Sequence, residues 1–163
     1  MAFEKTPRGT YGPKAPSFTV PVMKFMGNQM IKRFRRSGSG KAMGLDCLVL
    51  TTVGAKTGQK RQTLLAWFPD GEGAWLIVAS AGGMAANPAW YHNLAAHPDQ
   101  AQIEVGGKTV NVAAAQLAGP ERDAAWQRIL KAAPRYGGYE RKTDRVMPVI
   151  RLTATAGAPA DGG

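Results

Sequence analysis

Four short segments of the 163-residue chain hold residue types that could bind an anion or a planar ring. The first is Gly54-Ala55-Lys56-Thr57-Gly58-Gln59-Lys60-Arg61. Glycines let backbone N–H groups turn inward and form an anion-binding concavity, and Lys56, Lys60 and Arg61 add three cations to the same turn. Arg61 could hold a phosphate through two parallel hydrogen bonds. The alternative is a solvated basic hairpin that binds no ligand.

The second segment, Val78-Ala79-Ser80-Ala81-Gly82-Gly83, is a predicted strand that ends in small residues. Small side chains let a flat ring approach the backbone closely, where N–H groups could meet the carbonyls of the ring. Ser80 adds a hydroxyl at the end of the strand. Many strands end in this way, so the segment alone is a weak signal.

The third segment is Asn87-Pro88-Ala89-Trp90-Tyr91-His92-Asn93-Leu94. Proline is favoured in the first turn of a helix, and Asn87 could cap the exposed N–H groups there. Such a helix start attracts anionic groups. Trp90 and Tyr91 are adjacent and should point to different sides, so we expect one to pack inward and the other to reach a neighbouring surface. Core packing of Trp90 is the alternative.

The fourth segment is Tyr136-Gly137-Gly138-Tyr139. Two tyrosines on a glycine-flexible segment could form a movable wall over a planar ligand. Their hydroxyl groups, with pKa values near 10 when unperturbed, could donate a hydrogen bond or a proton. A simple surface loop is the alternative.

Charge and composition limit the partners. The formal net charge of +10 indicates an anionic partner, which could be nucleic acid, an anionic membrane face or a phosphorylated cofactor. Cys47 is the one cysteine and His92 and His97 are the two histidines, so we expect no disulfide within the chain and no metal site. Cys47 lies in an apolar run and is interpreted as a buried small side chain. Without a signal-peptide pattern or a bilayer-length apolar run, we expect a cytoplasmic protein.

The elements that position these segments are predicted from periodicity and turn residues. The pattern favours an extended arm over residues 1–17, one folded domain over 18–153 and a disordered tail over 154–163. It indicates an α+β fold with a mostly antiparallel sheet closing into a small barrel, flanked by helices. The expected helices are Phe18–Arg36, Pro88–Ala96 and Pro120–Ala132, and the expected strands are Cys47–Val53, Arg61–Phe68, Ala74–Ser80, Ala101–Val105, Lys108–Ala114 and Val146–Leu152. Pro148 suggests that the last strand is an edge strand.

The expected N-terminal helix is amphipathic and basic. One side gathers apolar residues and the other gathers polar or basic ones. The two sets are Val22, Met23, Phe25, Met26, Met30 and Phe34, against Lys24, Asn28, Lys32 and Arg35. Two interpretations stay open, which are packing of the apolar side on the core and peripheral contact with a membrane.

Three of the segments, taken in order, resemble one protein family. Gly54-x-Lys-Thr-Gly-x-x-Arg61, then Ala79-Ser80-x-Gly-Gly83, then Asn87-Pro-x-Trp-Tyr91 resemble the deazaflavin-dependent nitroreductase family of split β-barrel oxidoreductases. The similarity spans roughly Phe18 to Thr153. It implies a split β-barrel and coenzyme F420, a deazaflavin with a phosphate and a polyglutamate tail, whose negative charge would explain the basic composition.

The resemblance also implies roles for particular residues. The phosphate and tail would lie beside Ala55, Lys56, Thr57 and Arg61, and the ring would lie above Gln62, Thr63, Leu64, Leu65 and Ala66. Backbone donors to the ring would come from Val78, Ala79, Ser80 and Ala81. Another side of the site would be formed by Ala89, Trp90, Tyr91, His92 and Asn93, and Tyr136 would lie over the ring. A deazaflavin favours hydride transfer, so the implied acceptor is a small quinone, an activated alkene or a nitroaromatic compound. Candidate donors to the reduced acceptor are Ser80, Tyr136 and Tyr139.

The sequence departs from the nitroimidazole-activating branch of that family. Ala66 and Ala133 stand where that branch tends to have aromatic residues, so we expect a wider pocket and favour quinone or enone reduction over nitro reduction. The alternatives are a split-barrel enzyme that uses flavin mononucleotide and a deazaflavin carrier with no reaction of its own. A nucleic-acid-binding barrel is disfavoured, because basic and aromatic residues do not alternate along one strand as a stacking platform requires. The oligomeric state stays open.

Overall fold

The computed structural model of the chain describes residues 3, 5–13 and 20–155, with the side chains of 20–24 left out. The described strands are β1 (Lys41–Ala42), β2 (Leu45–Val53), β3 (Lys60–Ala66), β4 (Phe68–Pro69), β5 (Ala74–Val78), β6 (Ala101–Val105), β7 (Lys108–Gln116) and β8 (Val149–Ala154). The helices are α1 (Val20–Ser37), α2 (Ala89–Ala96), α3 (Gly119–Ala132) and α4 (Arg135–Glu140), with a short 3₁₀ turn at Ala81–Gly83. The predicted tail lies, from residue 156 onward, outside the described residues.

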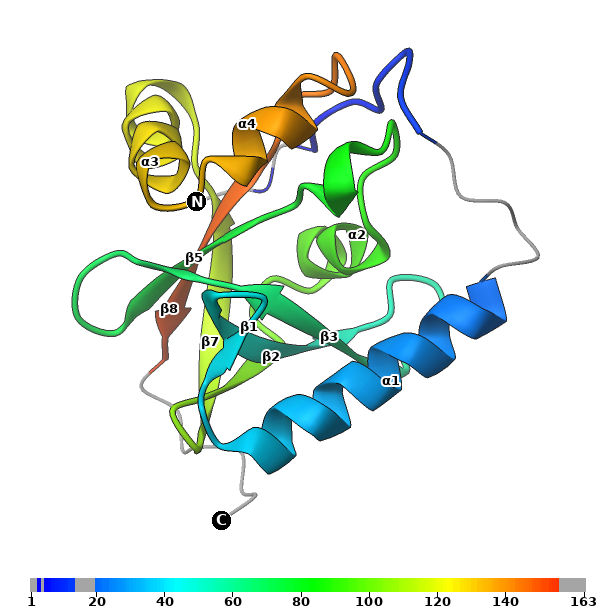
Figure 1. Cartoon of the computed structure of the whole chain (residues 1–163), viewed down its shortest axis with the longest axis vertical. Coiled ribbons are helices and arrows are strands. Elements are labelled where there is room, and N and C mark those ends of the chain that lie inside the picture. The colour runs from blue at the N-terminus through cyan, green and yellow to red at the C-terminus, as the bar shows by residue number, and fades with distance from the viewer. Residues whose placement is uncertain (1–2, 4, 14–19, 156–163) are drawn as a thin grey trace.

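The strands form one antiparallel sheet that curls on itself (Figure 1). Its order is β1-β2-β6-β7-β8-β5-β4, and β3 pairs with β2 along seven residue pairs from Cys47–Ala66 to Val53–Lys60. The prediction of an α+β fold with a mostly antiparallel sheet is confirmed, and the six expected strands correspond to β2, β3, β5, β6, β7 and β8. The other two strands have two residues each, which is too short to produce a periodic pattern.

The sheet separates two hydrophobic cores. Inside the curl, α2 packs against Leu50, Ile103 and other side chains of the barrel. On the outer face, α3 and α4 cover a second cluster around Leu76 and Val149, and these two helices lie together in Figure 1. Strands β5 and β8 alternate between the two cores: Val149 belongs to the outer cluster and Ile150 to the inner one. Burial on both faces explains why β5 is a continuous apolar run in the sequence.

The last strand is not at an edge, contrary to the prediction. It lies between β5 and β7, with Val149 opposite Val78 and Ile150 opposite Gln116. Pro148 precedes the strand, so its missing N–H interrupts no ladder, and its carbonyl accepts a hydrogen bond of 3.0 Å from the N–H of Ala79. The proline therefore begins the strand and does not exclude it from the middle of the sheet.

Helix α1 forms close to the predicted bounds, but its apolar side does not face the core. Phe25 is 64% exposed and Met30 43% exposed, whereas Ile31 is buried. The helix runs beside β3 (Figure 1), where Arg35 donates to both carboxylate oxygens of Glu104 and to the side chain of Gln62. The inward-packing interpretation is therefore wrong for Phe25, Met26 and Met30, while Phe34 is half-buried. In the described part of the chain, no helix is long and apolar enough to cross a membrane.

Within the predicted arm, residues 5–13 contain no helix or strand, and hydrogen bonds connect them to the body of the protein. The N–H of Thr6 donates to the hydroxyl of Tyr91 at 2.9 Å, and the N–H of Gly9 donates to the carbonyl of Ala85 at 2.8 Å. The N–H of Thr10 donates to the carboxylate of Asp144 at 2.7 Å. No local pattern predicts these contacts, which join residues up to 134 positions apart.

Candidate functional site

One cavity of about 190 Å³ brings together two of the four predicted segments, the second and the fourth, and the predicted ring-binding residues of β3. Its walls come from the end of β3, the end of β5 and helix α4. The site residues that line it are Leu64, Leu65, Ala66, Val78, Ser80, Tyr136 and Tyr139. All three candidate donors to the acceptor are thus in one cavity, although they come from segments more than fifty residues apart in the sequence.

Sequence reasoning missed half of the lining. The cavity is also lined by Met30 of α1, by Ala42, Met43 and Leu45 around the β1–β2 turn, and by Cys47, Gly82 and Arg135. The exposed methionine at position 30 follows directly from the orientation of α1 described above, which turns this residue away from the core. A helical wheel alone could not show this, because it identifies an apolar side without showing what covers it.

The loop after β5 reaches the cavity through an unusual backbone path. Ala81, Gly82 and Gly83 all have positive φ, at 48°, 64° and 88°. A Cβ atom at Gly83 would lie 2.8 Å from the carbonyl oxygen of Tyr139, so only glycine lets this loop contact α4 closely. The N–H of Ala79, predicted to face a ring, instead donates to Pro148. That predicted donor is therefore already engaged.

The two tyrosines lie on a helix and not on a movable loop. Tyr136 is 7% exposed, and its ring makes edge-on contacts with Phe68, Trp126 and Tyr139 at centroid distances of 5.7, 6.5 and 5.4 Å. Burial raises the pKa of Tyr136 to about 12, so its phenol stays protonated at neutral pH and is a donor. The prediction of a flexible wall is wrong because aromatic packing on both sides of Tyr136 outweighs the two glycines.

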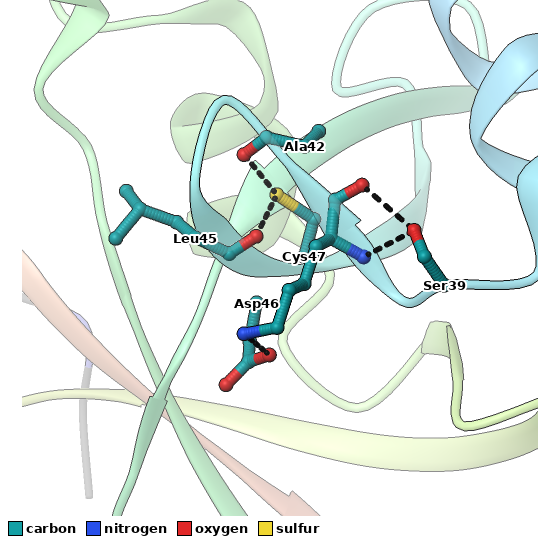
Figure 2. Close-up of polar contacts among 6 residues, drawn as sticks. Ser39, Ala42, Leu45, Asp46 and Cys47 are labelled. Carbon is teal, nitrogen blue, oxygen red and sulfur yellow. Dashed lines mark hydrogen bonds and ion pairs between the residues drawn. The ribbon is translucent and has the colours of Figure 1, made fainter.

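Cys47 lies in the cavity wall with its thiol turned toward the backbone. Figure 2 shows the sulfur between the carbonyl oxygens of Ala42 and Leu45, to which it donates at 3.7 and 3.5 Å. The pKa of this thiol is raised, mainly by burial. Because the thiolate is the reactive form, these contacts favour the predicted role as a small buried side chain.

The basic turn between β2 and β3 is well ordered by local hydrogen bonds. The N–H of Gly54 donates to the carbonyl of Gln59 at 2.8 Å, and the N–H of Gly58 donates to the carbonyl of Gly54 at 2.9 Å. The hydroxyl of Thr57 accepts from the N–H of Gln59 at 3.2 Å. Lys56, Lys60 and Arg61 are exposed, and within the residues described none of the three forms an ion pair.

The predicted residues of α2 lie behind this turn and not in the cavity. Trp90 and Tyr91 are both buried in the inner core, so the expectation that they point to different environments is wrong. The side-chain oxygen of Asn93 accepts from the N–H of Ala55 at 3.0 Å, and its nitrogen donates to the hydroxyl of Thr52 at 3.2 Å. His92 is half-buried and Ala89 is exposed. Burial lowers the pKa of His92, and the charge of Lys5 adds to the effect.

The start of α2 also differs from the prediction. Pro88 occupies the cap position, and no side chain caps the helix. The amide nitrogen of Asn87 donates instead to the carbonyl of Thr6 at 2.8 Å, and its oxygen accepts from Arg145 at 2.6 Å. Asn87 thus serves the packing of the loop and the arm.

Comparison with known proteins decides the family. The family model described as F420H(2)-dependent quinone reductase matches residues 26–154. The chain belongs to the F420H(2)-dependent quinone reductase family. This membership makes it an F420-dependent oxidoreductase whose cofactor is coenzyme F420. The predicted relationship to deazaflavin-dependent enzymes is therefore confirmed.

Individual proteins similar to this chain support the same family assignment. Proteins named F420H(2)-dependent quinone reductase from two strains of Mycobacterium tuberculosis are 46% identical over 109 residues, covering 65% of this chain and 72% of theirs. A solved structure of an F420-H2 dependent reductase (FDR-A) is similar with a TM-score of 0.59 and 36% identity, covering 65% of this chain and 92% of that one. Another, described as a domain-swapped dimer, has a TM-score of 0.60 and 32% identity, covering 80% and 98%. The predicted split β-barrel is confirmed by these likenesses.

Proposed function

We propose that the chain reduces a quinone with reduced F420 in the cavity between β3, β5 and α4. The observation that carries the proposal is the convergence of Leu64–Ala66, Ser80 and Tyr136 on this one cavity. When bound, the reduced cofactor supplies a hydride from the carbon centre of its ring. The chain has to orient the ring and the acceptor, exclude water and stabilise the charge that develops on the acceptor.

The described residues fit a ring with an acidic tail. Apolar side chains of β3 and β5 suit one face of a planar ring, while the cations of the basic turn carry no acidic partners among the residues described. Lys60 and Leu64 are four residues apart on the same strand and therefore on the same face, which corresponds to roughly 13 Å. Lys56, Lys60 and Arg61 would therefore hold the phosphate and glutamates at one end of β3 while Leu64–Ala66 support the ring at the other.

Two kinds of hydroxyl group are available to the acceptor. A tyrosine phenol is neutral at physiological pH, and the rise of the pKa of Tyr136 to about 12 extends this neutral form into the alkaline range, so the phenol can donate a hydrogen bond to an oxygen that gains negative charge. Tyr139 and Ser80 line the same cavity. We assign Tyr136 as the main donor, with Ser80 and Tyr139 as further donors. Solvent can deliver the final proton.

A quinone is the acceptor that the observations favour. Ala66 lines the cavity, so its small side chain leaves room there for an acceptor ring. Ala133, by contrast, is buried in the outer core and gives no support to the argument for a wider pocket. The names of the mycobacterial relatives add weight to quinones. Enones and nitroaromatic compounds are the competing acceptors.

The test is oxidation of reduced F420 by the purified protein across menadione, cyclohexenone and a nitroimidazole. We expect menadione to be the best acceptor, measured as kcat/KM. A higher kcat/KM with the nitroimidazole would overturn the choice of quinone, and no turnover with any acceptor would favour a cofactor carrier. Titration with flavin mononucleotide, followed by tryptophan fluorescence, is the companion measurement. Tight binding of this flavin without binding of F420 would contradict the proposal itself.

A further inference from the structure

Arg145 is a buried arginine whose guanidinium binds the loop behind the cavity. Its side chain is 3% exposed, and it reaches across the path from β5 to α2. Nη1 donates to the carbonyl of Ala79 at 2.8 Å, Nη2 to the carbonyl of Ser80 at 2.7 Å, and Nε to the carbonyl of Met84 at 3.0 Å. Nη1 also donates to the side chain of Asn87 at 2.6 Å.

The guanidinium has no acidic partner among the described salt bridges. The neighbouring carboxylate of Asp144 is exposed and accepts from Thr10. Burying a charge without a counterion is costly, and a guanidinium remains protonated in proteins. The donors of this buried guanidinium are directed at backbone carbonyls of the loop. We therefore interpret Arg145 as a residue that stabilises the conformation of the loop.

The loop that Arg145 binds is the one that reaches the cavity. The carbonyls of Ala79 and Ser80 flank the point where the chain leaves β5, and the next three residues all have positive φ. A positive φ is unfavourable for alanine, so the conformation at Ala81 requires stabilising contacts from outside the loop. Ser80 and Gly82 line the cavity, whereas Arg145 does not.

We propose that Arg145 is a positioning residue that holds the Ala79–Met84 loop so that Ser80 and Gly82 form the ring-binding wall of the cavity. The proposal rests on the function proposed above. Arginine is required because its planar fork reaches several carbonyls in different directions at once, while a lysine offers a single nitrogen. Loss of the guanidinium should therefore make the ring-binding wall less ordered and leave the tail site at the basic turn intact.

The experiment compares two ligands, oxidised F420 and its deazaflavin riboside without phosphate and glutamates. In Arg145→Lys we expect both ligands to bind about tenfold more weakly, the loss expected when one charged hydrogen-bond donor is misplaced. The visible circular dichroism of the bound ring, which reports a fixed orientation, should also weaken. Arg122→Gln is the matched control, because Arg122 is another largely buried arginine that donates to a carbonyl, that of Met147 at 2.8 Å, but lines no part of the cavity. This control should lower the melting temperature without changing either ligand signal.

The outcomes separate this proposal from the proposed function. Equal ring affinity and circular dichroism in folded Arg145→Lys and in the parent would overturn the role of Arg145 alone. If the parent binds neither ligand, the proposed function fails and this inference with it. Should Arg145→Lys not fold, Asn87→Ala decides, since it removes one of the four acceptors. We expect about threefold weaker binding of the riboside in that variant, and unchanged binding would overturn the proposal.

Discussion

Arg135 donates a hydrogen bond of 2.9 Å to the carbonyl oxygen of Met43. The two residues lie on opposite lining elements of the cavity, Arg135 at the start of α4 and Met43 at the turn between β1 and β2. Met43 is 73% exposed and has a φ of 53°, an unfavourable value for a residue with a side chain. This bond therefore joins the β1–β2 turn to α4 beside the cavity.

Replacing Arg135 should widen the cavity without emptying the cofactor site. In Arg135→Met the turn loses its bond to α4, so we expect the KM for menadione to rise about threefold, with little change in cofactor affinity. Steady-state kinetics at saturating reduced F420 measure this. Lys131→Met, an exposed change on α3, is the control. An unchanged KM in the arginine variant would show that the turn does not limit acceptor binding.

Asn93 should matter for the acidic tail and not for the ring. Asn93→Ala removes the acceptor of the Ala55 N–H and leaves the buried hydroxyl of Thr52 without this donor. We expect the free energy of unfolding to fall by about 1–3 kcal/mol and F420 to bind more weakly, while binding of the riboside is retained. Urea unfolding and fluorescence titration measure the two effects. Gln127→Ala on the exposed side of α3 controls for loss of an amide.

The tail interaction should also depend on salt if the exposed cations provide it. Lys56→Ala and Arg61→Ala should each weaken F420 binding, and the difference from the parent should shrink as ionic strength rises, because exposed charges are screened. Parent-like affinity in both variants at low salt would mean that the tail does not bind at this turn.

Tyr136 makes stability sensitive to alkaline pH. The folded chain raises its pKa from 10 to about 12 through burial, so folding favours the neutral phenol. The contribution is complete below pH 10 and is lost as pH rises from about 10 toward 12. We expect the free energy of unfolding, measured by urea at pH 9 and pH 11, to decrease less in Tyr136→Phe than in the parent. Turnover at pH 7 should fall more than cofactor affinity in the same variant. An identical pH dependence would contradict a buried phenol at this position.

Cys47 should react slowly despite its place in the cavity wall. Burial raises the pKa of the thiol, and its proton is directed at two backbone carbonyls, so little thiolate is present at pH 8. Alkylation by iodoacetamide should be much slower in the native protein than in urea, as followed by mass spectrometry. Rapid modification of the native protein would mean that the β1–β2 turn opens readily.

Much of this architecture could be predicted from local pattern. Apolar runs and turn residues located the six longer strands because most of these strands have buried residues, and the spacing of Gly54, Lys56 and Arg61 identified the basic turn. The cavity could not be derived in the same way, since it depends on how β3, β5 and α4 meet in space. The family resemblance supplied that connection.

The errors have a common physical origin in tertiary packing. Gly137 and Gly138 indicated a flexible loop, yet the ring of Tyr136 packs between Phe68 and Trp126 and stabilises a helix there. Pro148 indicated an edge strand, although a proline just before a strand interrupts nothing. The apolar side that includes Met30 indicated either packing on the core or contact with a membrane, and Met30 instead lines the cavity. In each case a contact with a distant segment outweighs a local preference.

A crystal structure of the protein with oxidised F420 tests the central claim most directly. We predict that the ring rests against Leu64–Ala66 and Ser80, below Tyr136, and that the phosphate and glutamates extend along β3 to Lys56 and Arg61. A ring bound outside this cavity, or a tail directed away from the basic turn, would contradict the account.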